Sequence, residues 1–224
     1  SLSYLEKLPG CAGIKIFMGS STGTLLVSGE KDIEKALKNC NRRVAIHSED
    51  EDRLIERFKK VSKKFGVKGH EKWRDVKSAL LSTQKVLKYA EKHKTNAHIL
   101  HISTKDEMEI LKNKRNFVTI EVTPQHLTLF SPDCYNRLGA LAQMNPPIRN
   151  KSHQNGLWKG IKDGTVNVIG SDHAPHTLKE KKNIWPASPS GMPGVQTLLP
   201  IMLNHVNNGK LDLKRLIELT SVNA

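Results

Sequence analysis

The chain has 224 residues, of which 37% are apolar, and this is enough for one α/β domain with its own core. Its 36 lysine and arginine residues outnumber the 22 acidic residues, which gives a formal net charge of +14. We interpret this charge as a solvated surface and expect no nucleic-acid partner, because the lysines are scattered over expected helix surfaces and only 5% of the residues are aromatic.

Cysteine usage and hydropathy indicate a cytoplasmic protein. Cys11, Cys40 and Cys134 are odd in number and far apart in the sequence, which fits neither a disulfide framework nor a zinc ribbon. The sequence contains no apolar run of about 18 residues and no signal-peptide pattern. We therefore expect neither a membrane span nor export.

The first expected strand covers residues 12–18 and carries a lysine, Lys15, within an apolar run. It follows a short helical lead-in that Pro9 and Gly10 stop. An ammonium ion in a buried strand is costly, so Lys15 is expected to be paired, deprotonated or covalently modified. The alternative is an edge-strand lysine whose amine reaches water.

Strands and helices alternate along the rest of the chain. In the third strand, period-two alternation puts His101 on the same face as Ile99. Residues 131–150 are expected to form a loop that ends in two stiffening prolines, and residues 186–194 resemble an active-site loop. The later strands are expected at 43–47, 97–102, 117–122 and 165–170, and helices at 30–39, within 51–93, and at 105–113, 152–163, 194–206 and 211–220.

This alternation implies a parallel sheet, and polar residues at successive strand ends suit a TIM barrel better than a doubly wound sheet. No Gly-x-Gly-x-x-Gly turn follows any expected strand, which weakens a Rossmann fold further. We predict an α/β, TIM-barrel-like fold. A complete barrel takes eight strands and roughly 250 residues, so the strands expected here make a partial barrel with two edge strands and an exposed inner face.

Four side chains on different expected strands form a candidate metal site. Neutral imidazole and carboxylate are good ligands for first-row metals, and three or four of them at one barrel mouth can hold Zn²⁺ with open positions for water. A single strand histidine is more often structural, but the joint placement of these residues predicts a metal centre. The four candidates are Lys15, His47, His101 and Asp172.

Several segments, taken together and in chain order, resemble dihydroorotases. The Asp172-His-Ala-Pro-His segment with the following Glu180-Lys181 is more similar to dihydroorotases than to allantoinases or hydantoinases, which share the metal ligands. The match runs almost end to end and is far more specific than any single motif. The segments are Lys15-Ile-Phe-Met, His47-Ser-Glu-Asp, His98-Ile-Leu-His101, Glu121-Val-Thr-Pro, Asn145-Pro-Pro-Ile-Arg149, Gly170-Ser-Asp-His-Ala-Pro-His-Thr and Pro189-Ser-Gly-Met-Pro-Gly194.

The resemblance implies a zinc-dependent cyclic amide hydrolase of the class I type, in the amidohydrolase superfamily. Such an enzyme interconverts N-carbamoyl-L-aspartate and dihydroorotate in pyrimidine biosynthesis. Lys15 matches the carboxylated lysine whose carbamate bridges two metal ions. His47 and His101 match ligands of the second metal, and Asp172 matches a ligand that also acts as general base.

The resemblance also implies residues that contact the substrate, which is a small molecule. These matches are Asn145, His176 and the backbone at Pro193 and Gly194. Gln125 departs from the family pattern, in which a histidine is more usual beside His126.

A larger departure is that the family's His-x-His motif, which supplies two ligands of the first metal, has no counterpart here. By resemblance, residues 1–224 form a partial barrel domain of about strands four to eight, without the His-x-His strand and the β-sandwich segments. We therefore expect the chain alone to be inactive, with a complementing amino-terminal chain or a homo-oligomer as partner. Two alternatives stay open: a non-catalytic dihydroorotase-like partner or remnant, and an allantoinase- or hydantoinase-like hydrolase.

Overall fold

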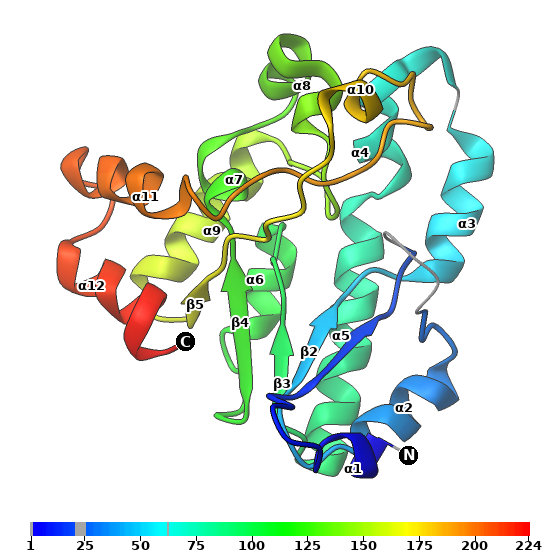
Figure 1. Ribbon diagram of the computed structural model, residues 1–224, viewed down its shortest axis with the longest axis vertical. Helices are drawn as coiled ribbons and strands as arrows, with labels where there is room; N and C mark the ends of the chain where they lie inside the picture. Colours follow the sequence, from blue (N-terminus) through cyan, green and yellow to red (C-terminus); the bar gives the residue numbers. More distant parts are fainter. Residues whose placement is uncertain (1, 21–25, 62) are drawn as a thin grey trace.

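A sheet of five parallel strands is the centre of the computed structural model, which describes residues 2–20, 26–61 and 63–224 (Figure 1). The strands lie side by side in chain order, from β1 to β5. All of them lie where the sequence predicted strands, and the fold class is confirmed as part of a β/α barrel. Their bounds are β1 Ile14–Phe17, β2 Val44–His47, β3 Ala97–Ile99, β4 Val118–Val122 and β5 Val168–Ile169.

The two faces of the sheet differ because side chains alternate along each strand. One face is buried under helices and carries a row of isoleucines in register: Ile16, Ile46, Ile99 and Ile120. The other, here called the inner face, carries the row Lys15, Ala45, His98 and Thr119.

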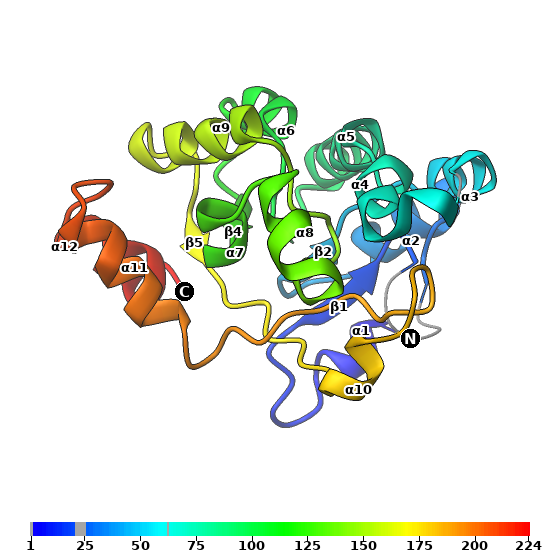
Figure 2. The same ribbon diagram turned by 90° about the horizontal axis from the view of Figure 1, so that it is seen from above.

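Helices cover the isoleucine face and leave the inner face open (Figures 1 and 2). Among the described residues, no helix is both long and apolar enough to cross a bilayer. The helices of the covering layer are α2 Glu30–Lys38, α5 Val76–His93, α6 Lys105–Leu111 and α9 Lys151–Lys162. The others are α1 Leu2–Leu5, α3 Glu51–Lys60, α4 Gly69–Trp73, α7 Pro124–Thr128, α8 Asp133–Leu138, α10 Leu178–Lys181, α11 Leu198–Asn207 and α12 Leu213–Ile217, with short turns η1 Lys63–Lys68, η2 Gly139–Ala142 and η3 Glu218–Val222.

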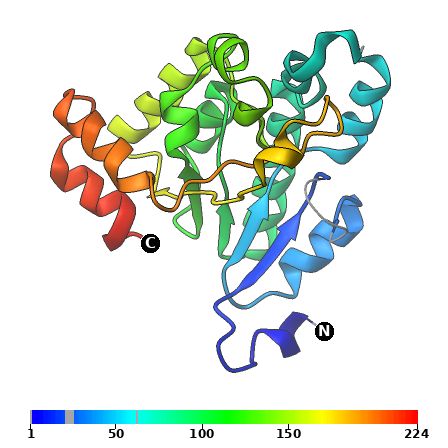
Figure 3. The same ribbon diagram turned by 45° about the horizontal axis from the view of Figure 1, so that its top comes forward.

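Helix starts follow from local capping chemistry. The Asp75 side chain accepts the backbone N–H of Ser78 at the start of α5, and Thr104 and Glu107 form a reciprocal capping box at the start of α6. The segment between β5 and α11 passes the carboxyl ends of the strands, reaches α10 and returns (Figure 3). These ends therefore lie beneath one continuous segment.

Two sequence expectations about helices were wrong. Residues 131–150 contain α8 and η2, and the expected loop is confined to the stretch around the two prolines. Cys134 and Tyr135 of α8 are buried in a small second core, which favours a helix where composition suggested a loop. The helix α7 was also not expected; its proline takes the first turn, where a missing N–H costs nothing.

The expected burial of Lys15 was wrong as well, because its side chain is exposed. Lys15 lies on the inner face, and no described segment covers that face at β1. The open face itself agrees with the prediction of a partial barrel. The alternative of a lysine that reaches water therefore describes the structure.

Candidate active site

Two histidines from neighbouring strands meet at the carboxyl edge of the sheet. His47 is the last residue of β2, and His101 follows β3. Nδ1 of His47 and Nε2 of His101 are 3.1 Å apart, and the rings meet edge to face with centroids 4.8 Å apart. Both residues are buried, with 1% and 3% exposure.

A left-handed backbone conformation brings His101 to this position. Its φ is 37°, and that of Asp172, which follows β5, is 42°. Such values are uncommon outside glycine, and strained backbone of this kind clusters at functional sites. The prediction that His101 shares a face with Ile99 was wrong, because regular alternation ends with the strand at Ile99.

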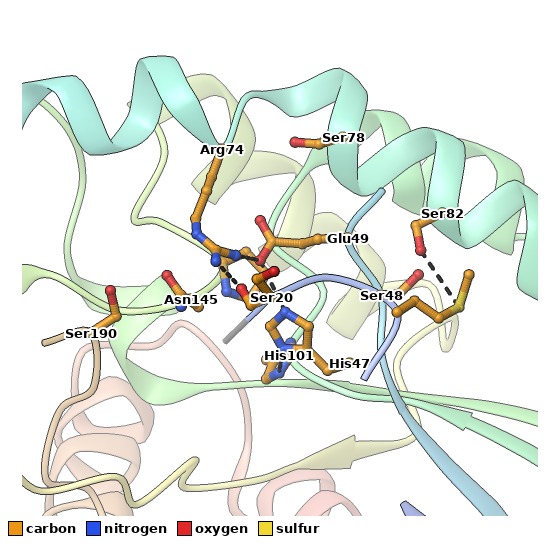
Figure 4. Close-up of polar contacts among 12 residues, drawn as sticks. Ser20, His47, Ser48, Glu49, Arg74, Ser78, Ser82, His101, Asn145 and Ser190 are labelled. Atoms are coloured by element: carbon orange, nitrogen blue, oxygen red, sulfur yellow. Dashed lines mark hydrogen bonds and ion pairs between the residues drawn. The ribbon is translucent and has the colours of Figure 1, made fainter. Parts of the chain in front are cut away.

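A buried ion pair supports His47 from behind. The Glu49 carboxylate accepts a hydrogen bond from Nε2 of His47 at 3.0 Å and is paired with the Arg74 guanidinium, which also donates to the Ser20 carbonyl (Figure 4). Glu49 and Arg74 are 0% and 1% exposed. Burial alone would raise the pKa of Glu49, but Arg74 and His47 hold it below its ordinary value.

This arrangement leaves two imidazole nitrogens facing each other. An ionised carboxylate only accepts hydrogen bonds, so Nε2 of His47 is the donor to Glu49, and Nδ1 is the ring nitrogen that faces His101. Burial, helped by His47, lowers the pKa of His101 and keeps it neutral. Two neutral, buried ring nitrogens, one of them backed by a carboxylate, fit a first-row divalent cation.

The other two predicted ligands do not join the pair, and Lys15 lies in register with Ala45, two residues before the strand position that pairs with His47. The Lys15 ammonium is 4.7 Å from the centroid of the Phe17 ring, which is itself 5.7 Å from the His47 ring. Asp172 is half-buried in the loop after β5. Within the described ranges, no three His, Cys, Asp or Glu side chains form a metal-binding group.

Asn145, a predicted substrate contact, is oriented by a buried histidine. His70 donates from Nε2 to the Asn145 side-chain oxygen and to the Met144 carbonyl, both at 3.0 Å. The Ser190 hydroxyl lies 3.5 Å from the same nitrogen. Figure 4 places Asn145 and Ser190 on the Ser20 side of the Glu49–Arg74 pair.

Comparisons with known proteins show which proteins the chain is similar to. No protein-family model matches the chain. Dihydroorotase from Methanosarcina mazei is 37% identical over 234 residues, which cover 99% of this chain and 51% of that protein. Dihydroorotase from Pyrococcus furiosus is 35% identical over 211 residues, which cover 93% of this chain and 45% of that protein. The chain is a homologue of dihydroorotases.

Solved structures show the same fold in relatives with a different name. L-hydantoinase from Arthrobacter aurescens matches with a TM-score of 0.88 at 24% identity. The match covers 99% of this dihydroorotase homologue and 52% of the hydantoinase chain. Dihydropyrimidinase from Brevibacillus agri matches with a TM-score of 0.86 at 24% identity, and the match covers 98% of this homologue and 51% of the dihydropyrimidinase chain. The homologue thus spans about half the length of the curated relatives and solved structures that it matches.

The remaining predicted substrate contacts of the dihydroorotase homologue lie on two adjacent loop segments. His176 donates from Nε2 to the Ser190 carbonyl at 3.1 Å. The Gly194 N–H donates to Nδ1 of His173 at 3.1 Å, and Pro193 is exposed beside it. A side chain at Gly194 would collide with the Ser171 carbonyl, so this close approach requires glycine.

The sequence did not predict the contacts of three residues that hold parts of the candidate site in place. Gln125 donates to the Ser171 carbonyl at 2.9 Å and so holds the residue before Asp172. Lys181, quoted only as a point of resemblance, donates to the carbonyls of Gln143, Pro189 and Gly191 at 2.9–3.0 Å. Arg74 had no local signal, whereas Glu49 stood in the quoted motif two residues after His47.

Proposed function

We propose that this dihydroorotase homologue supplies one part of a dihydroorotase-type active site. The reaction is hydrolysis of the cyclic amide of dihydroorotate, and in reverse the closure of N-carbamoyl-L-aspartate, as a step of pyrimidine biosynthesis. The observation that carries the proposal is the facing pair of nitrogens, His47 Nδ1 and His101 Nε2, at the carboxyl edge of the sheet. The names of the relatives support the substrate class.

His47 and His101 would hold one divalent cation, with Asp172 and Lys15 from the neighbouring strands as further ligands. When bound, Zn²⁺ supplies Lewis acidity at neutral pH. Lys15 would act as a carbamate, whose formation requires a neutral amine. Because Lys15 is exposed on the inner face, this role requires further protein over that face.

The proton is moved by Asp172. Its carboxylate would take a proton from the attacking water and pass it to the ring nitrogen as the amide bond breaks, which is general acid–base catalysis. Asn145, His176 and the Gly194 backbone would orient the ring and its carboxylate. The His70 hydrogen bond to Asn145 and the Ser190 hydrogen bond to His176 restrict these side chains before the substrate binds.

The thiols support a reducing compartment, and we propose the cytoplasm. Cys11, Cys40 and Cys134 are free. Burial raises the pKa of the Cys40 and Cys134 thiols to about 11, so these two stay protonated and unreactive at neutral pH.

The test is dihydroorotate hydrolysis with added Zn²⁺ and bicarbonate, by the chain alone and by a fusion with the part of the Methanosarcina mazei dihydroorotase that it does not cover. We expect no turnover alone, because without a His-x-His motif the first metal keeps at most the Lys15 carbamate and Asp172 from this chain, which is fewer than the roughly three protein ligands of a catalytic zinc. We expect turnover by the fusion, and its loss in His101→Gln. The matched control is His98→Gln on the same strand, which removes a histidine that bonds Thr119 at 2.8 Å.

Two results count against the proposal. Turnover by the isolated chain that disappears in His101→Gln would show that the ligand count is wrong. A folded fusion without turnover would favour a non-catalytic partner, and hydrolysis of hydantoin in place of dihydroorotate would favour the hydantoinase alternative.

A further inference from the structure

We propose that Glu49 and Arg74 are positioning residues that fix the tautomer of His47, with its proton on Nε2 and its Nδ1 lone pair directed at His101. The inference deepens the proposed function, because it names the groups that prepare one cation-facing nitrogen. It concerns side chains that do not themselves touch the substrate.

The Glu49 carboxylate can determine the tautomer because a single oxygen serves both partners. Oε2 accepts from Nε2 of His47 and also pairs with Nη1 of Arg74. Oε1 is buried and has no hydrogen-bond partner among the described residues. Oε2 is therefore the carboxylate oxygen that accepts from His47, and the same oxygen is held by Arg74.

Arg74 holds this oxygen in place through contacts with four parts of the chain. Its guanidinium donates to Glu49 after β2 and to the Ser20 carbonyl after β1. It also lies 4.8 Å from the centroid of the Trp73 ring. The Arg74 carbonyl in turn accepts from Nη1 of Arg149, which is itself buried. A rigid planar donor held at both ends leaves the carboxylate little freedom to turn away from His47.

The proton order between the two histidine rings follows from this arrangement. A bound cation needs a lone pair on both facing nitrogens. Without a cation, a His47 with its proton on Nε2 can only accept at Nδ1, so His101 donates from Nε2 across the 3.1 Å contact. Nδ1 of His101 is then a buried lone pair, which agrees with its lack of a partner among the described residues. Without the carboxylate, neither order is preferred, because each leaves one buried ring N–H and one buried lone pair without a partner, and a fraction of His47 would donate from Nδ1 to Nε2 of His101.

An ion pair with a purely structural role would stabilise the fold without setting this order. The two roles are separated by the ring protons, which nitrogen-15 NMR of histidine side chains reports directly. Spectra of the full chain are recorded at about pH 8, above the ordinary histidine pKa of about 6.5, so that neutral tautomers are compared. His47→Gln and His101→Gln assign the two ring systems.

The informative variant is the double substitution Glu49→Met and Arg74→Met. Removing one partner would leave a buried charge unpaired, whereas replacing both by apolar side chains of similar size is often tolerated. Wild-type His47 is expected to be protonated on Nε2 alone, and the double variant to be a mixture of the Nε2 and Nδ1 tautomers, with the matching mixture in His101. Glu107→Gln is the control, since Glu107 is also buried but bonds Thr83 and Thr104 and not His47.

Two outcomes overturn the proposal. A wild-type His47 protonated on Nδ1 does so without any variant, and this measurement stands even if the double variant does not fold. A folded double variant that keeps the proton on Nε2 shows that the carboxylate does not set the tautomer. Both outcomes are independent of dihydroorotate turnover, so a failure here is distinguishable from a failure of the proposed function.

Discussion

His70 is a buried histidine beside the candidate site, and its protonation is linked to folding. Burial, followed by the nearby Arg74, lowers its pKa to about 3. In the unfolded chain a histidine titrates near 6.5, so the unfolded state binds the extra proton between about pH 3 and 6.5. This stability is present above pH 6.5 and is lost as the pH falls through that window, by up to about 1.4 kcal/mol per pH unit.

The measurement is urea unfolding at about pH 7 and about pH 5, in wild type and in His70→Gln. The variant is expected to be less stable at neutral pH and to lose less on acidification. His93→Gln is the control, because that half-buried histidine pairs with the half-buried Glu34 and lies outside the candidate site. Equal acid dependence in wild type and His70→Gln would contradict the assignment.

Asp172 is the residue to which the proposed proton transfer is assigned. In the active fusion, Asp172→Asn keeps the shape of the side chain and removes the base. We expect kcat to fall by about 10²–10⁴-fold, the usual contribution of a positioned base, because the amide cannot take the proton. Steady-state kinetics on dihydroorotate measure this, and a variant with full kcat would exclude Asp172 as the base.

At the scale of elements, the short helix α10 fastens a loop to the body of the domain. Its last residue, Lys181, donates to three carbonyls, while the Gln143 side chain donates to the Ser188 carbonyl and the Ser190 hydroxyl. The Gly191 N–H closes the contact by donating to the Gln143 carbonyl. This docking places Ser190 beside His70 and His176.

Lys181→Met is expected to release that loop without unfolding the sheet. A buried acceptor left unsatisfied costs about 1–3 kcal/mol, so amide protection in residues 188–194 should fall roughly 10-fold or more. Hydrogen exchange of peptides from this segment measures the effect, with strand β4 as internal reference. Lys179→Met, at an exposed position of the same helix, should leave the amide protection of residues 188–194 unchanged. Equal protection in the two variants would show that Lys181 does not hold the loop.

At the scale of the whole molecule, the positive charge invites a test for nucleic acid. Many of the lysines are exposed on helices, and several pair with carboxylates, such as Lys92 with Glu34 and Lys112 with Glu109. If the charge only solvates the surface, a random DNA duplex at physiological salt should bind no tighter than about 10⁻⁴–10⁻⁶ M. Fluorescence anisotropy with a labelled duplex measures this, and a saturable nanomolar complex would contradict the interpretation.

Local patterns in the sequence predicted the strands and most of the helices. Val44 and Ile46, for example, mark β2 by alternation, which depends only on near neighbours in the chain. The sequence also predicted that Lys15, His47, His101 and Asp172 would converge at one end of the sheet, since parallel strands share a carboxyl edge. Apolar burial overrode local composition at α8, where Cys134 and Tyr135 made a helix of an expected loop.

Which of these side chains touch depends on how the strands and helices pack. The contact between His47 and His101 depends on a left-handed residue that alternation cannot encode. The pair Glu49–Arg74 joins residues 25 apart, of which one follows β2 and the other follows α4. Exposure of Lys15 likewise depends on what covers the inner face, which no pattern around Lys15 specifies. Long-range contacts of this kind arise from the packing of whole elements, so near-neighbour patterns in the sequence do not contain them.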